Sequence, residues 1–86
     1  MLHKYRTKEP IKAEQFDGSE EMMKRYHITY NAFSDTFTFR LDNERLPLKR
    51  GWWIVYHGEF KVMGYKMQDW RTMDDNKFRK TYERYE

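Results

Sequence analysis

The chain has 86 residues, which is enough for one domain and too few for two. It contains no cysteine, which excludes disulfides, thiolate metal sites and a cysteine nucleophile. Seventeen Lys and Arg against fourteen Asp and Glu leave a net charge of +3, and the interspersed signs favour an ordinary solvated surface over a dedicated polyanion face. No stretch has the length and apolar character of a membrane span or a signal peptide, so we expect one cytoplasmic domain over residues 1–86 with no membrane partner.

Aromatic residues dominate the apolar content of the chain. Three Trp, seven Tyr, six Phe and six Met outnumber the Leu, Ile and Val residues. The core must therefore be built mostly from rings and thioethers, which bury large areas per residue. So many rings are hard to bury completely in a small domain, and we expect some Tyr and Trp at the surface, where such residues anchor interfaces.

The first elements in chain order are a strand and a short helix. Apolar and polar side chains alternate over most of residues 11–16, which predicts a strand. A helix is predicted over residues 19–26, with Asp17 or Ser19 as its cap, acids in its first turn and bases in its last. Its apolar side consists of Met22, Met23 and Tyr26. Core filling is the usual role of such methionines.

The chain reads as β-structure from Ile28 onward. Residues 36–41 show the clearest alternation, with Phe37, Phe39 and Leu41 on the side predicted to face the core. The segment 46–48 predicts a short edge strand, because its central proline cannot donate to a ladder.

A β-hairpin is predicted next. Residues 52–56 and 59–63 are rich in β-formers, and His57-Gly58 between them supplies a glycine for the turn. Successive strand residues point to opposite faces, so Trp52 and Trp53 cannot both enter one core. Trp52 is therefore a candidate for an exposed ring.

The chain closes with a predicted helical turn over residues 74–80. Asp74-Asp75-Asn76 is typical of a helix cap, and Phe78, Tyr82 and Tyr85 follow at helical spacing. A short helix followed by a terminal strand near residues 81–85 fits almost as well. The fold class expected from all elements is α+β, with one small antiparallel sheet, open or barrel-like, and the two short helices.

The chain lacks the common patterns of catalytic and metal sites. It has no glycine-rich phosphate loop, no nucleophile elbow and no ligand-spaced histidine pair. His57 lies at the predicted hairpin tip and His27 after a helix end, where neither has an orienting partner. Asp74 and Asp75 are better explained as a cap than as ion ligands. We expect a protein that is not an enzyme, with no catalytic residues, no metal and no cofactor.

Three stretches in register resemble a family of small phage and prophage proteins, common in phages of Gram-positive bacteria. The family pattern runs Tyr-Arg-x-x-Pro, Glu-Ala-x-Gln-Phe-x-Gly, a Gly-Asp-Trp/Tyr-Ile turn before Gly-Glu, and a final Phe-x-x-x-Tyr-Glu. The corresponding stretches here are residues 5–18, residues 50–60 and residues 77–83. The resemblance implies a phage gene product and no particular biochemical role.

Two of the departures from the family pattern bear on a binding site. Trp52 stands where the family has an acid, and the spacing between Phe60 and Phe78 is longer. The added residues lie within 62–73, a segment rich in Met, Tyr, Trp and cations. Two interpretations remain open: a contact surface, or an extension of the hairpin that packs Trp70 over an edge of the sheet.

Two functions follow from these features. The first is a phage-encoded binding protein that contacts a host or phage protein, with anchors at Trp52, Tyr65, Met67, Trp70 and Arg71. The alternative is a small basic nucleic-acid-binding protein that stacks bases on its rings. Its candidate phosphate contacts are Arg50, Lys61, Lys66 and Arg71.

Overall fold

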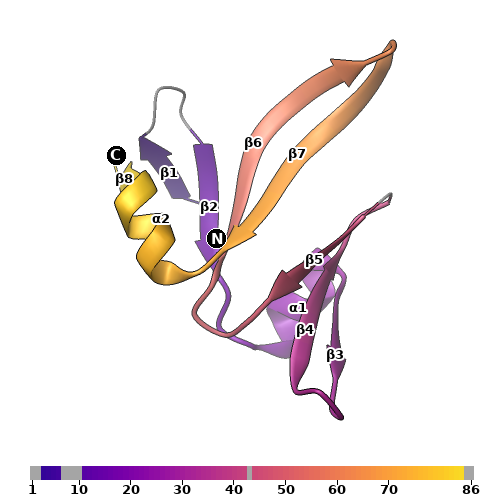
Figure 1. The fold of residues 1–86 in the computed structure, drawn as a ribbon, viewed down its shortest axis with the longest axis vertical. Coiled ribbons are helices and arrows are strands. Elements are labelled where there is room, and N and C mark those ends of the chain that lie inside the picture. Colours follow the sequence, from indigo (N-terminus) through magenta and orange to yellow (C-terminus); the bar gives the residue numbers. More distant parts are fainter. Residues whose placement is uncertain (1–2, 7–10, 43, 85–86) are drawn as a thin grey trace.

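The computed structural model describes residues 3–6, 11–42 and 44–84 of the chain. Within these ranges the strands form two antiparallel sheets, accompanied by two short helices (Figure 1). The larger sheet contains β1 (His3–Arg6), β2 (Ile11–Gln15), β6 (Trp53–Val62), β7 (Tyr65–Met73) and β8 (Glu83–Arg84), in the order β7-β6-β2-β1-β8. The smaller sheet contains β3 (Ile28–Asn31), β4 (Thr36–Arg40) and β5 (Arg45–Leu48), in that order.

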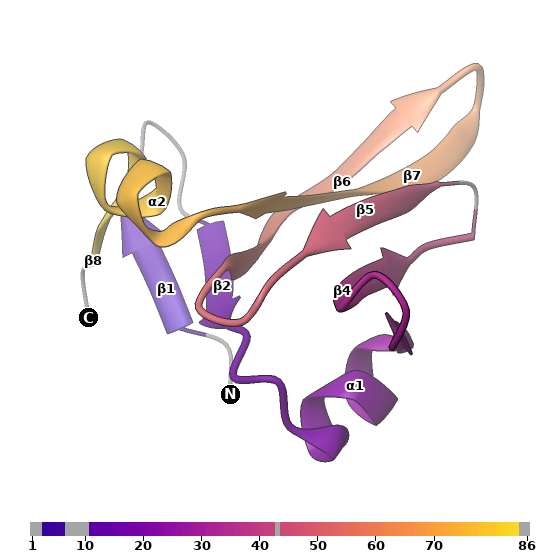
Figure 2. The same ribbon diagram turned by 60° about the horizontal axis from the view of Figure 1, so that its bottom comes forward.

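This architecture confirms the predicted α+β class and changes the expected sheet. The chain builds two sheets where one was predicted, and in the described residues neither sheet closes on itself. The barrel-like variant of the prediction is therefore wrong. Closure of a sheet would require its two outer strands to pair with each other. The outer edge of β7 instead contacts β5 of the smaller sheet through a side chain, since Thr72 donates its hydroxyl to the Pro47 carbonyl at 2.7 Å. Pro47 lies in β5, which is an edge strand of the smaller sheet, as predicted (Figure 2).

Helix α2 (Asp75–Thr81) packs against the larger sheet and closes the first core. Asp74 caps this helix by accepting from the Lys77 amide at 2.8 Å, which confirms the predicted start. Phe78 stacks on Trp53 with ring centroids 3.9 Å apart and planes at 6°. This first core consists of Ile11, Ala13, Trp53, Val55, Met73, Phe78 and Tyr82.

Helix α1 (Glu20–Tyr26) and the smaller sheet enclose a second core. Ser19 caps the helix, and His27 ends it in the left-handed conformation at φ 56°, close to the predicted bounds. Phe37 and Phe39 point inward from β4 as their alternation predicted, while Leu41 is only partly buried. This second core consists of Phe16, Met22, Ile28, Phe37, Phe39, Leu48 and Ile54.

Strand β6 forms a wall of both cores. Trp53 and Val55 belong to the first core, whereas Ile54 between them belongs to the second. Period-two alternation thus buries both faces of the strand, which explains why this stretch reads as a nearly continuous apolar run. Trp52, just before the strand, is partly buried against the second core. The two tryptophans therefore pack on different cores, and Trp52 is less exposed than predicted because both faces of β6 are covered.

The predicted turn at His57-Gly58 is wrong. Strand β6 continues through these residues, and the pairing passes from Tyr56↔Trp70 to Glu59↔Gln68. Two residues of β6 therefore stand opposite one residue of β7, which is a β-bulge, with Gly58 at φ 96°. A bulge and a tight turn both use a glycine with positive φ, so the same signal predicted the wrong feature.

The true turn lies at Met63-Gly64, both at positive φ, 51° and 84°. In the described residues β2 pairs with β6 as far as Lys12↔Tyr56, and beyond the bulge the described pairs of β6 and β7 are with each other alone. This two-stranded part, residues 59–62 and 65–68 with the turn between them, is called the arm below. It projects from the body of the molecule (Figure 1).

Candidate functional site

The arm has two unlike faces. Residues directly opposite one another in an antiparallel ladder share a face. On one face the pairs are Phe60 with Met67 and Val62 with Tyr65. On the other face the pairs are Glu59 with Gln68 and Lys61 with Lys66. The arm therefore carries an apolar face and a polar face with two lysines.

The apolar face of the arm is exposed to solvent. Phe60 and Val62 expose 44% and 46% of their surface, and Tyr65 exposes 75%. Met63 at the tip is 92% exposed, and Met67 is partly buried. An isolated two-stranded ribbon is marginally stable in water, and exposed apolar side chains in a group are uncommon unless something covers them. Both facts point to an interaction surface.

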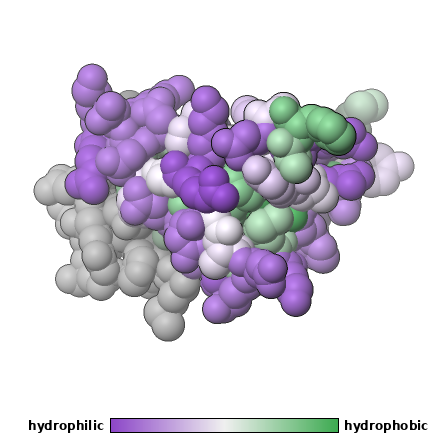
Figure 3. Space-filling view, turned by 90° about the horizontal axis from the view of Figure 1, so that it is seen from below, coloured by the Kyte–Doolittle hydropathy of each residue, from purple (hydrophilic) through white to green (hydrophobic). Residues whose placement is uncertain are grey.

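A groove of about 640 Å³ lies on the polar side, where the arm meets the smaller sheet and the end of α1. Three rings line it, those of Tyr26, Phe39 and Trp70. Charged groups from both sides line it as well, namely Arg40 and Asp42 from β4 and its following turn, and Glu59 and Lys66 from the arm. Seen from the end with α1 and the smaller sheet, apolar residues form patches in a mostly hydrophilic surface (Figure 3).

Trp70 is partly buried and packs against other rings at the base of the arm. Its ring centroid lies 4.7 Å from that of Tyr56, 5.5 Å from Phe39 and 6.1 Å from Tyr26. Its Nε1–H donates to Gln68 Oε1 at 3.1 Å. This packing agrees with the second interpretation of residues 62–73, in which the segment extends the hairpin and packs Trp70 against the fold.

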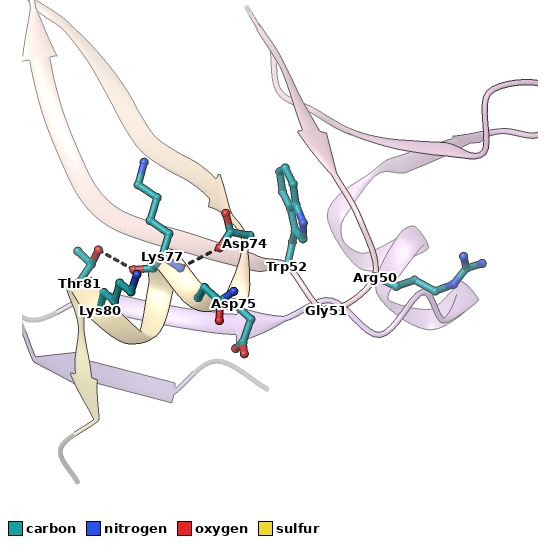
Figure 4. A pocket seen from close by; sticks show the side chains of 9 residues that line it. Arg50, Gly51, Trp52, Asp74, Asp75, Lys77, Lys80 and Thr81 are labelled. Atoms are coloured by element: carbon teal, nitrogen blue, oxygen red, sulfur yellow. Dashed lines mark hydrogen bonds between the residues drawn. The ribbon is translucent and has the colours of Figure 1, made fainter.

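Trp52 lies away from the arm, beside a second, polar hollow of about 670 Å³ (Figure 4). Lys49 Nζ lies 6.0 Å from the Trp52 ring centroid. The acids at this hollow are already engaged, since Asp74 caps α2 and Asp75 accepts from Trp53 Nε1 at 2.9 Å and from Arg79 Nε at 2.8 Å. These hydrogen bonds, with the positive charge of Arg79, hold the pKa of Asp75 below its usual value.

The predicted phosphate-binding cations do not form one surface. Arg50 lies over the Phe37 ring at 4.8 Å and points away from the hollow in Figure 4. Arg71 pairs with Asp69 at 3.1 Å, and this hydrogen bonding raises the pKa of Arg71. Lys61 and Lys66 alone are neighbours, as a cross-strand pair on the arm.

One buried carboxylate joins β2 to α1. Glu14 is 8% exposed, accepts the Tyr26 hydroxyl at 2.6 Å, and receives both terminal nitrogens of Arg25 at 3.2 and 3.3 Å. Burial acts to raise the pKa of Glu14, but hydrogen bonding and nearby positive charge outweigh it and hold this pKa below its usual value. Burial and the bond to Glu14 raise the pKa of Tyr26. These bonds connect α1 to β2 of the larger sheet.

The two histidines whose side chains the structure describes lie in different parts of the fold. His57 Nε2 lies 2.8 Å from the Tyr82 hydroxyl, at the rim of the first core, and His27 ends α1. In the part of the chain that the structure describes, no three His, Asp or Glu side chains lie close enough together to hold a metal ion.

Sequence reasoning found part of the arm and missed part of it. Tyr65 and Met67 were singled out, and both lie on the apolar face. Phe60 was assigned to a hairpin strand alone, whereas Val62 and Met63 were assigned both to that strand and to the segment 62–73, for which a contact surface was one of two open interpretations. The alternation of Phe60 with Val62 and of Tyr65 with Met67 is the signal that would have found the face, once the turn is placed at Met63-Gly64.

No helix of the described chain has the length and apolar character needed to cross a membrane. No family model, no curated protein and no solved structure matches this chain. The resemblance to small phage proteins therefore stays a prediction from the sequence.

Proposed function

We propose that this chain is a non-enzymatic binding protein, encoded by a phage or prophage, that contacts a host or phage protein through the arm. The observation that carries the proposal is the exposed apolar face of Phe60, Val62, Tyr65 and Met67. These four side chains and Met63 at the tip form a continuous group on a projecting element. Among the described residues the other exposed apolar rings, Tyr30 at 44% and Phe33 at 104%, lie in β3 and in the β3–β4 turn, at another part of the molecule.

The physical argument concerns stability as well as exposure. Residues 59–62 and 65–68 form a ribbon that no described element covers on its apolar face, and such a ribbon gains little from its own two strands. A partner that covers Tyr65 and Val62 removes their apolar surface from water, at roughly 25 cal/mol per Å². Tyrosine is also among the residues that dominate the binding energy of protein interfaces.

The nucleic-acid alternative has less support. Binding of a single strand uses exposed ring faces for stacking beside a line of cations. Here Trp70 is enclosed by Tyr56, Phe39 and Tyr26, and Arg71 is paired with Asp69. Lys61 and Lys66 remain as the one adjacent pair among the four candidate phosphate contacts.

The test is affinity capture from a lysate of phage-infected Gram-positive cells, with the arm altered at exposed positions only. The variant Val62→Ser with Tyr65→Ser removes the apolar surface, and Phe33→Ser is the matched control because it removes an exposed ring elsewhere. We expect a partner protein that the control retains and the arm variant loses, and that survives nuclease and raised salt. Equal retention by both variants would rule out the arm as the contact. Recovery of nucleic acid alone, lost at high salt, would favour the alternative.

A further inference from the structure

We propose that the partner contributes an extended segment in which acidic and apolar residues alternate, and that this segment adds to the free edge of β7 as a further strand. The inference rests on the proposed function, because it names the partner's chemistry and its mode of docking at the same arm. Three features of the arm support it: an open backbone edge, two faces of different character, and unpaired cations.

The backbone edge is the first feature. β7 is an edge strand of the larger sheet, and in the described residues its outer edge pairs with no other strand. Near the end of β7, Thr72 donates to the Pro47 carbonyl of β5. Nearer the tip, the residues of β7 that line the groove are Lys66, Met67, Gln68 and Trp70. The edge from residue 65 to residue 70 is about 20 Å long and can pair with a strand of about six residues. Proteins commonly capture extended peptides at such an edge.

The two faces of the arm dictate the sequence of the added strand. A strand paired with β7 continues both faces, because its side chains alternate in the same way. Residues beside Tyr65 and Met67 extend the apolar face and should be apolar. Residues beside Lys66 extend the polar face and should be acidic. A strand that alternates the two kinds matches the whole arm, whereas a uniformly apolar or uniformly acidic strand matches one face only.

The cations are the third feature. Lys61 and Lys66 lie directly opposite each other, an arrangement that is destabilising in a ladder. Among the described residues, neither lysine has an acid within ion-pair distance. Arg40, across the groove from Lys66, is itself opposite Arg45 in the smaller sheet. Asp42 and Glu59 also line the groove, so the like-charge repulsion on the arm is confined to the Lys61–Lys66 pair, and a carboxylate placed beside Lys66 would offset it.

A polynucleotide also carries negative charge, but it fits the edge poorly. It has no backbone donors and acceptors at strand spacing, so it leaves the β7 edge unpaired. It would also need open ring faces beside the cations, but the exposed Tyr65 ring lies on the face opposite Lys66, and the groove's Trp70 ring is packed against three others. The free edge therefore favours a peptide.

The experiment uses the whole protein and synthetic peptides of about seven residues in which Glu and Val alternate. Binding is followed by fluorescence polarisation, and backbone amide exchange locates the site. The expected result is binding that protects the outward amides of residues 65–70. A peptide N-methylated on its pairing edge should lose at least about tenfold in affinity, while N-methylation on the opposite edge should cost little. The variant Lys61→Glu with Lys66→Glu should likewise bind about tenfold more weakly and should now prefer a Lys–Val peptide.

The control variant Lys77→Glu with Lys80→Glu makes the same change of charge on α2, away from the arm, and should bind as the unaltered protein does. No detectable peptide binding, binding that ignores the edge carrying the N-methyl groups, or equal losses in both charge variants would overturn the proposal. Tighter binding of a single-stranded oligonucleotide at this groove would overturn it too. The proposed function is tested separately, because a partner captured through Val62 and Tyr65 supports it even where the peptide fails.

Discussion

Replacing Trp70 with alanine separates the structural role of this ring from a binding role. The ring contacts Tyr56, Phe39 and Tyr26 and connects the base of the arm to the second core. Aromatic pairs of this kind contribute about 0.5–1.5 kcal/mol each beyond burial, and truncation of a fully buried Trp costs about 3–5 kcal/mol. Because Trp70 is only partly buried, we expect Trp70→Ala to lower the free energy of unfolding by about 2–3 kcal/mol.

Urea denaturation followed by far-ultraviolet circular dichroism measures this loss. For a domain of this size it corresponds to a melting temperature lower by roughly 10–20 °C. The control is Tyr65→Ala, which removes a ring that is 75% exposed and should change the stability by less than about 0.5 kcal/mol. If Trp70→Ala were as stable as the control, the ring would not hold the arm base to the core, and our account of the groove would fail.

Three further predictions concern single residues in the body and in the arm turn. The pKa of Glu14 is held below its usual value in the folded protein. Its contribution to the free energy of unfolding is therefore fully present above the unfolded pKa near 4.5 and is lost as pH falls through the lower folded pKa. Glu14→Gln should remove this dependence and flatten the acid side of a plot of stability against pH. Met63 occupies a left-handed position before Gly64, where Asn is preferred, so Met63→Asn should raise the melting temperature through about 0.5–1 kcal/mol of added stability. Asp74→Ala removes the bond to the Lys77 amide and should cost about 0.5–2 kcal/mol in urea denaturation, whereas Asp74→Asn should cost much less.

Local signals predicted the two helices and the inward face of β4 well, but not the division into two sheets. Ser19 and Asp74 cap the two helices, and their positions were evident because capping depends on residues within one turn of the chain. The alternation of Phe37 with Phe39 likewise predicted the inward face of β4. These features depend on neighbours in the sequence and can be predicted from the sequence alone.

The arm could not be predicted in the same way, because the position of its turn depends on long-range strand pairing. Gly58 and Gly64 both have positive φ, and local chemistry does not say which one reverses the chain. The pairing of β6 with β2 up to Tyr56 and with β7 beyond it extends the strand through Gly58. Misplacing the turn hid the shared face of Phe60 and Tyr65. The surroundings of Trp70 depend on three distant elements and were equally out of reach.

The central claim is that the apolar face of the arm contacts a partner protein, and site-specific photo-crosslinking in Gram-positive host cells tests it most directly. A photoreactive phenylalanine analogue would replace Tyr65 in one protein and Phe33 in another, both exposed rings in different parts of the molecule. We predict a crosslinked protein of defined mass from position 65 and none from position 33. The same adduct at equal yield from both positions, or crosslinks to nucleic acid alone, would contradict the account.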